Sequence, residues 1–275
     1  MNLATTPCIL PRHAARVIRT AIIAALTVAP FIPAPAAHAE CSNPGFAPAT
    51  TFNLAPSNAG TLIAGSAFQD DASLVLPVVP FPLRFAGQTY TAASVSTNGV
   101  LQFGSGFMTN EFVNFPLPYS NFNAAIMAFW DDLVTTGSGG GIYTNTAGTS
   151  PNRTFEVRWQ VASINDQNVP FSFSIYFFEN PSQPDFVIAY NPAASALSRG
   201  SAATIGLQTS STGPAQTFSI DQASITPGLN LQSTCRGTDF TYQGRLSNAG
   251  APANGTFNLS FTYVDLLGAP LAPAI

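Results

Sequence analysis

Apolar and polar residues alternate in several short stretches of this chain, and a period of two residues indicates half-buried β-strands. The clearest stretch is 155–161, where aromatic and branched side chains take every second position and Glu156 and Arg158 lie between them. Residues 171–177 repeat the pattern with serine and tyrosine between apolar residues. No stretch after residue 39 sustains a period of 3.6 residues, so the pattern predicts an all-β fold with antiparallel strands.

A hairpin is predicted at residues 95–103, where Asn98–Gly99 separates two short runs of strand-forming residues. A type I′ turn needs positive φ at both central residues, and Asn and Gly adopt such values most readily. A lone hairpin is marginal in water, so its apolar face must pack against another sheet. Residues 124–130 are apolar almost throughout, which predicts a central strand that is buried on both faces.

Further strands are expected wherever a short apolar run lies between turn residues. These are 52–54, 74–79 (irregular or at an edge, because prolines interrupt it), 81–85, 142–143, 186–190, 204–208 and 217–220. We expect a long surface loop over residues 104–123, held by Phe107, Phe112 and Phe115, and a flexible glycine-rich loop over 137–141. Many short strands with turns between them are typical of an antiparallel β-sandwich.

The first 39 residues resemble a secretory signal peptide. Three arginines precede the apolar run 21–32, and Ala37 and Ala39 form the small-residue pattern of a cleavage site. The apolar run is shorter than the roughly 20 residues that cross a bilayer. We therefore predict export, to the medium or the cell surface, with no membrane span in the mature chain; a retained membrane anchor is the alternative.

Export would change the chemistry that is available to the chain. Both histidines and three of the nine basic residues leave with the signal, and the chain contains no lysine. The remaining six arginines face 13 acidic residues, a formal net charge of −7. Binding of nucleic acid or an anionic membrane needs clustered Lys and Arg, so we expect neither. Without His or Lys, the common nucleophilic triads, His-ligated zinc and Schiff-base chemistry are excluded.

Two cysteines remain after cleavage, Cys41 and Cys235, and they bracket the predicted strands. In an oxidising compartment we expect them to form a disulfide that joins the two ends of the sandwich; two free thiols are the alternative. We predict one sandwich domain over residues 40–236. Residues 237–275, with strands at 240–246 and 257–264, would be the start of a second, incomplete β unit, because two strands cannot bury a core.

Four motifs in this order resemble nidogen-type extracellular (NIDO-like) domains, in the form found in secreted bacterial proteins. They are residues 95–104, 126–133, 151–159 and 204–208, and the resemblance spans roughly 75 to 210. It implies an extracellular β-sandwich without known catalysis, of the kind present in adhesion and matrix proteins. Residues 240–246, which contain the run Tyr-Gln-Gly-Arg-Leu, together with 252–256, resemble a repeat-like module that opens in long bacterial surface proteins.

Asp131 and Asp132 are the candidate ligand residues, because they end the apolar run 124–130 ahead of a glycine-rich loop. Carboxylate oxygens are ligands that Ca²⁺ prefers, although no calcium-binding spacing is present. Adjacent strand residues point to opposite faces, so the pair could act together only if the strand has ended. The alternative is that one aspartate accepts hydrogen bonds from nearby backbone N–H groups and binds no metal.

These observations favour a non-enzymatic binding or adhesion module that takes an extracellular protein or glycan through loops such as 104–123 and 134–141. The alternatives are a calcium-dependent carbohydrate-binding module that uses Asp131 and Asp132, and a structural spacer. A glycosidase needs two carboxylates across one cleft, and no spacing selects a pair. Trp130 and Trp159 could stack on sugars, but their apolar surroundings in the sequence favour burial in the core.

Overall fold

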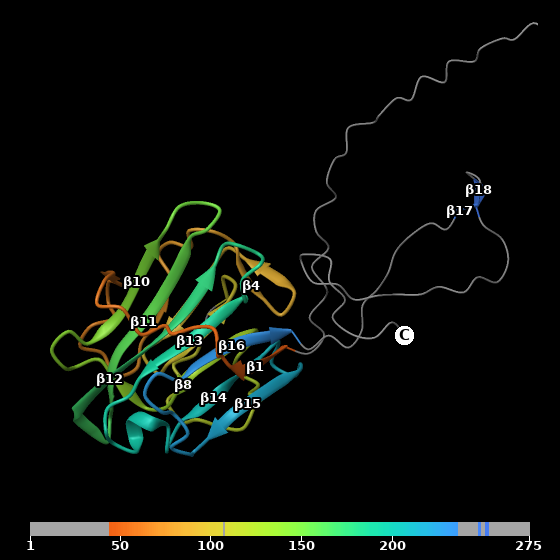
Figure 1. Ribbon diagram of the computed structural model, residues 1–275. Coiled ribbons are helices and arrows are strands. Elements are labelled where there is room, and N and C mark those ends of the chain that lie inside the picture. The colour runs from red at the N-terminus through yellow and green to blue at the C-terminus, as the bar shows by residue number, and fades with distance from the viewer. Residues whose placement is uncertain (1–43, 107, 236–246, 249–250, 253–275) are drawn as a thin grey trace, which may run out of the picture. The chain divides into compact units, whose positions relative to one another are not determined.

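The computed structural model describes residues 44–235 except 107, and the short segments 247–248 and 251–252 (Figure 1). Most strands belong to two antiparallel sheets. The first sheet has eight strands. In spatial order it contains β1 (Pro44–Pro48), β16 (Asn230–Cys235), β13 (Phe186–Asn191), β12 (Asp166–Phe178), β11 (Thr154–Ser163), β10 (Gly141–Ala147) and β2 (Thr61–Leu62), with β9 (Leu133–Val134) also paired to β11.

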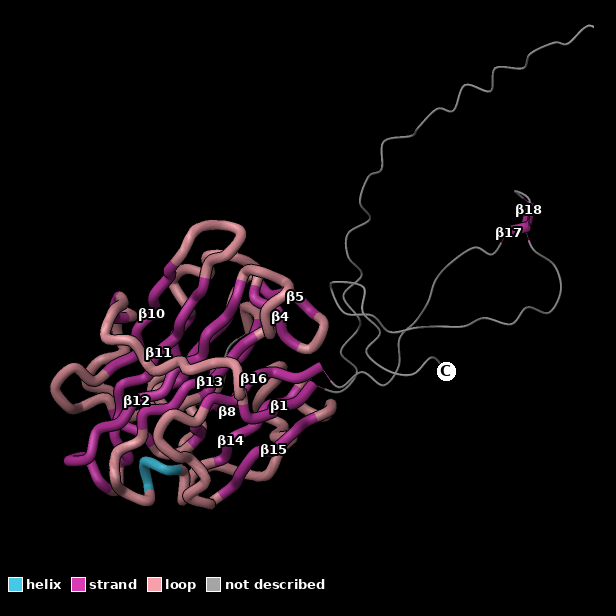
Figure 2. The backbone as a smooth tube through the Cα atoms, in the orientation of Figure 1, coloured by secondary structure: helices cyan, strands magenta, loops and turns pink. Residues whose placement is uncertain are grey.

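The second sheet has six strands, and it packs against the first to make a sandwich. Its order is β15 (Ala215–Ile220), β14 (Thr204–Gln208), β8 (Ala125–Trp130), β7 (Val100–Phe103), β6 (Ala93–Ser96) and β3 (Ser73–Val75). A separate hairpin joins β4 (Leu83–Phe85) to β5 (Gln88–Tyr90), and β17 (Ser247–Asn248) pairs with β18 (Ala251–Pro252). The single helical turn in the described residues, η1 (Leu197–Arg199), stands out among strands and loops in Figure 2.

The alternating sequences form the long strands as predicted, and their apolar positions meet in one core between the sheets. Every second side chain of β11 and of the second half of β12 belongs to this core, including Trp159 and Phe173, whose rings stack 5.2 Å apart. Strand β8 lies between β14 and β7 and is buried along its whole length. It contributes Ile126, Ala128 and Phe129 to the core between the sheets, and Trp130 to a smaller cluster.

That smaller cluster lies under the loop 104–123. It consists of Val100, Met108, Phe122, Ala125, Met127 and Trp130. The expectation that Phe112 helps to hold this loop is wrong: its side chain is 46% exposed, and Met108 and Phe122 do the packing instead. Phe115 is also exposed but lies against Tyr119, and Phe107 falls outside the described residues.

The edge of the eight-stranded sheet contains two strands that the sequence pattern did not predict. Strands β1 and β16 pair with Pro44 opposite Cys235, so the first and last strands of the sandwich lie side by side. Residues 52–54 were expected to be a strand, but they run as irregular chain. The predicted Cys41–Cys235 disulfide involves Cys41 and the side chain of Cys235, which lie outside the described residues, as do the strands expected at 240–246 and 257–264.

A hairpin joins β6 to β7 through Asn98 and Gly99 as predicted, but the turn is not type I′, because Gly99 has positive φ and Asn98 does not; the turn is also buried. Gly99 has φ +76°, and a Cβ atom there would overlap the carbonyl oxygen of Phe129. The Phe129 amide donates to the Gly99 carbonyl oxygen at 3.2 Å, which holds the turn against β8. Glycine is therefore required here both for its φ value and for the close approach of β8.

We predict that Gly99→Ala lowers the free energy of unfolding by about 3 kcal/mol or more, because the added methyl group strains the backbone and displaces β8. Urea unfolding would measure the change. Gly104→Ala is the matched control, since Gly104 has φ +93° but open space around its Cβ direction. That variant should cost only about 1 kcal/mol. Equal costs for the two variants would show that the contact with Phe129 is unimportant.

Candidate functional site

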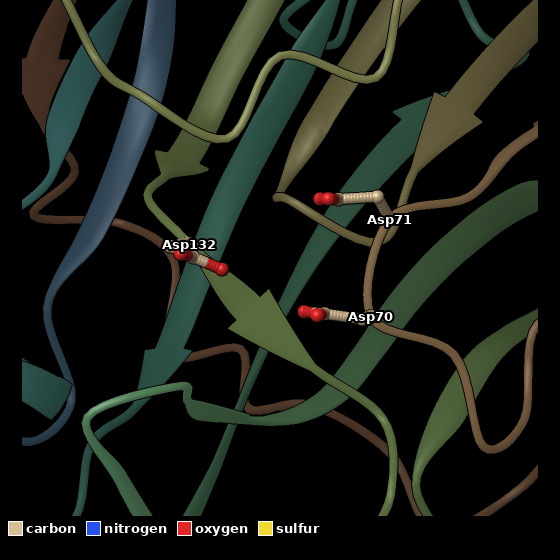
Figure 3. A group of neighbouring side chains, drawn as sticks. All are labelled: Asp70, Asp71 and Asp132. Atoms are coloured by element: carbon tan, nitrogen blue, oxygen red, sulfur yellow. The ribbon is translucent and has the colours of Figure 1, made fainter.

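Three aspartates from two distant segments lie together on the sandwich (Figure 3). Asp70 and Asp71 precede β3, and Asp132 lies in the connection between β8 and β9. One carboxylate oxygen from each lies within 4.8 Å of the others. Asp70 and Asp71 are exposed and Asp132 is half-buried, so solvent reaches the group. We call Asp70, Asp71 and Asp132 the acidic cluster.

The turn Ser96–Gly99 between β6 and β7 holds both segments of the acidic cluster, the one with Asp70 and Asp71 and the one with Asp132. The buried Asn98 side chain donates to the Asp71 carboxylate at 2.8 Å and accepts from the Leu133 amide at 2.9 Å. The Thr97 hydroxyl donates to the carbonyl oxygen of Asp70 and accepts from the amide of Ala72. Two neighbouring turn residues thus position Asp70 and Asp71 opposite Asp132.

The acidic cluster concentrates negative charge. Partial burial raises the pKa of Asp132, and repulsion from Asp70 and then Asp71 raises it further. Carboxylate oxygens at this spacing could jointly ligate a hard cation such as Ca²⁺, with backbone or water oxygens completing its shell of six to eight ligands. Equally, the cluster could accept hydrogen bonds from a cationic side chain of a partner.

Asp131 is not part of the acidic cluster. Its side chain is 6% exposed, and its Oδ1 accepts from the Asp132 amide at 2.9 Å while its Oδ2 is buried without a hydrogen-bond partner. Burial is the main cause that raises the pKa of Asp131 to about 7; the hydrogen bond from the Asp132 amide opposes this rise, and the charges of Asp132 and Asp221 add to it. The structure therefore groups Asp132 with Asp70 and Asp71, which the sequence interpretation missed, and separates it from Asp131.

The polar face of β11 is buried, where a solvated face had been expected. Glu156 is 2% exposed, and its carboxylate accepts hydrogen bonds from the Ser57 amide and from the hydroxyl groups of Ser57, Ser174 and Tyr176. The irregular segment before β2 thus covers this face. Arg158 lies over the ring of Tyr143 at 4.2 Å.

Arg153, just before β11, does not pair with Glu156. Its guanidinium forms a salt bridge with Glu179 at 2.7 Å. That pairing lowers the pKa of Glu179 to about 2, mainly through the hydrogen bonds from Arg153. Trp130 and Trp159 are fully buried, as the sequence predicted, so neither is available to stack on a sugar.

A cavity of about 300 Å³ lies elsewhere, between β1, the β4–β5 hairpin and residues 181–186. Phe85, Phe186 and Leu207 line it, and Arg84 and Asp185 lie at its wall, 3.6 Å apart. The guanidinium of Arg84 also donates to the carbonyl oxygens of residues 178, 180, 181, 183 and 184. Arg84 is thus occupied in fixing the loop before β13.

Loop 104–123 is the second surface of interest, because its backbone is fixed while three of its apolar side chains, Phe112, Val113 and Phe115, are exposed. The Trp130 indole donates to the Glu111 carbonyl oxygen at 2.9 Å, and the Thr204 hydroxyl donates to that of Phe115 at 3.1 Å. The Gln208 side chain accepts from the Tyr119 amide and donates to the carbonyl oxygens of Tyr119 and Phe122. Anchoring of this kind is typical of a recognition loop on a rigid scaffold.

We predict that Asp131→Asn raises the free energy of unfolding at pH 8 by about 4 kcal/mol and leaves it nearly unchanged at pH 4. The folded chain holds a proton on Asp131 up to about pH 7. An unfolded aspartate releases its proton near pH 4, so stability falls as pH rises from about 4 to 7 and is level above that. Asparagine cannot ionise and keeps an oxygen for the Asp132 amide. Urea unfolding at both pH values measures the effect, and a difference independent of pH would contradict the ionisation argument.

Comparison with known proteins places these features in a family. The sequence profile described as "NIDO related" matches residues 46–262, which includes the whole acidic cluster and loop 104–123. The match runs past residue 236, where the sequence predicted the sandwich domain to end. No curated protein and no solved structure matches the chain significantly. Because the profile covers most of the sequence, this chain belongs to the NIDO-related family.

Proposed function

We propose that this chain is a non-enzymatic binding or adhesion module of a secreted or cell-surface protein. Membership of the NIDO-related family, whose domains are non-catalytic modules, supports an extracellular role. The signal-like residues 1–39 support export, and no described helix is long and apolar enough to cross a membrane. The division into a domain over residues 40–236 and a second module from 237 onward is also part of this proposal.

The observation that carries the proposal is the construction of loop 104–123. Three of its apolar side chains, Phe112, Val113 and Phe115, are more than 40% exposed on a backbone that β8 and β14 hold in place. Exposed apolar side chains on a fixed loop are typical of a recognition surface, because little conformational entropy is lost on binding. The ligand class that fits is an extracellular protein or glycan.

We expect the purified, labelled chain to bind one or more members of an array of extracellular matrix proteins, envelope proteins and glycans. Binding should persist in EDTA, since the loop needs no metal to keep its conformation. Phe112→Ser should weaken binding about tenfold or more, whereas Val78→Ser, which changes an even more exposed apolar side chain outside the loop, should have no effect. An array without any bound component would count against the binding module and favour the structural spacer.

A calcium-dependent carbohydrate-binding module is the second candidate function. It is supported by the geometry of the acidic cluster, whose three carboxylates lie close enough together to share one cation. The sequence interpretation used Asp131 and Asp132 as ligands. With the structure, the ligand set that we propose for this alternative is Asp70, Asp71 and Asp132, because their oxygens converge. Calcium would also relieve the repulsion that raises the pKa of Asp132.

Thermal unfolding in EDTA and in millimolar CaCl₂ tests the calcium candidate. If calcium binds the folded chain, the melting temperature rises by several degrees, as mass action requires for a ligand that binds only the native state. Asp132→Asn should abolish the rise and Asp131→Asn should preserve it, which separates the acidic cluster from the adjacent aspartate. A melting temperature that does not change with calcium would remove this candidate and leave the binding module as proposed.

A further inference from the structure

The exposed apolar side chains of loop 104–123 lie between acidic groups. Residues 110–114 span the distance from Asp71 to Asp221: the Asn110 side chain donates to the Asp71 carbonyl oxygen at 3.3 Å, and the Asn114 side chain donates to the Asp221 carboxylate at 2.9 Å. Glu111 lies within the span. The exposed Phe112 and Val113 are therefore bounded on both sides by carboxylates.

In the part of the chain that the structure describes, no arginine forms an ion pair with a carboxylate of this span. Between described residues, ion pairs form only from Arg84 to Asp185 and from Arg153 to Glu179, and neither touches the span. The other two described arginines form no ion pair with a described residue: Arg158 lies over Tyr143, and Arg199 is the last residue of η1. The acidic cluster adjoins one end of the span, so five carboxylates lie on or beside it: Asp70, Asp71, Glu111, Asp132 and Asp221.

We infer that residues 109–115 and these five carboxylates form a docking surface for a protein segment in which arginine or lysine side chains alternate with apolar ones. This rests on the proposed binding function and names the partner's chemistry. Apolar side chains at the centre with charge around them are the usual anatomy of a protein interface. The uncompensated carboxylates would attract a basic partner and speed its association, and they would repel nucleic acid and anionic membranes.

The alternatives fit this surface less well. A second copy of the chain would bring the same carboxylates opposite themselves, and like charges across an interface oppose association. A purely apolar ligand would bury the rim carboxylates without a partner, which is costly. A basic, apolar segment satisfies both parts, because its aliphatic side chains cover Phe112 and Val113 while its cations reach the carboxylates.

The test uses the purified full chain and three synthetic peptides of 14 residues that alternate Arg with Leu, Glu with Leu, and Arg with Ser. Fluorescence anisotropy should show saturable binding of the Arg–Leu peptide, at least tenfold tighter than the other two. Its affinity should fall about tenfold between 50 and 500 mM NaCl, as screening requires. No saturable binding, or equal binding of the Arg–Ser peptide, would overturn the inference.

Two surface variants locate the peptide on the proposed surface. Phe112→Ser should lower the affinity for the Arg–Leu peptide about tenfold, and the salt dependence of binding should remain. Glu111→Gln keeps an oxygen for its contact with Asn121 and should slow association three- to tenfold while reducing the salt dependence. The matched controls are Val78→Ser and Asp185→Asn, which remove one exposed apolar side chain and one negative charge at other sites. Equal loss in variants and controls would contradict the assignment.

Further outcomes separate this inference from the proposed function. If a ligand found on the array binds Phe112→Ser and Glu111→Gln as tightly as the native chain, the docking surface is wrong although the binding module stands. Sedimentation that shows self-association lost in Phe112→Ser would also overturn the inference, because the surface would then bind a second acidic copy. Calcium that displaces the Arg–Leu peptide would support the inference, since both cations would then compete for the same carboxylates.

Discussion

The sandwich depends on four consecutive residues, Ser96 to Gly99, which connect both sheets and the acidic cluster. The Ser96 carbonyl oxygen accepts from the Trp159 indole of the opposite sheet at 2.8 Å. Thr97 and Asn98 hold the segment before β3 and the start of β9, and Gly99 lets β8 approach. The bonds from the Trp159 indole to Ser96 and from the Leu133 amide to Asn98 are buried, so leaving either of them unmade would cost more than losing the same contact at a surface. This turn therefore does more than connect β6 to β7, because it also contacts the opposite sheet, the segment before β3, the start of β9, and β8.

The strands of the inner sheet faces could be predicted because burial on one face imposes a period of two on the sequence. Strands β1 and β16 could not, since two prolines bound β1 and β16 is largely polar, and their stability comes from pairing with distant residues. Alternation also cannot tell whether a polar face meets water or a covering segment. Glu156 shows this: its position in the pattern is that of a solvated residue, yet Ser57 covers it.

Only one residue of the acidic cluster, Asp132, could be predicted from the sequence, for a related reason. The sequence indicates Asp131 and Asp132 equally, because both end the apolar run 124–130 ahead of a glycine-rich loop. Asp70 and Asp71 form an equally plain pair in the sequence, but nothing near them indicates that β3 will pair with β6 and bring them beside Asp132. Only the long-range pairing of strands identifies them. The exposed side of loop 104–123 was hidden in the same way, because Phe112 and Phe122 look alike until the loop is placed on β8.

The charge of the acidic cluster and the chemistry of its ligand are linked through protons. Because partial burial, and then the charges of Asp70 and Asp71, raise the pKa of Asp132, the cluster releases its last proton less readily than an isolated aspartate does. Any cation that binds there, whether a metal ion or a basic side chain, must lower that pKa, and affinity for the cation must therefore increase as pH rises through it. Repulsion among the carboxylates lowers the stability of the folded chain. A bound cation relieves this repulsion, and the relief adds to the binding free energy. A site with a built-in arginine would lack this property, and for that reason the absence of an ion pair between the acidic cluster and the described arginines matters more for recognition than the number of carboxylates does.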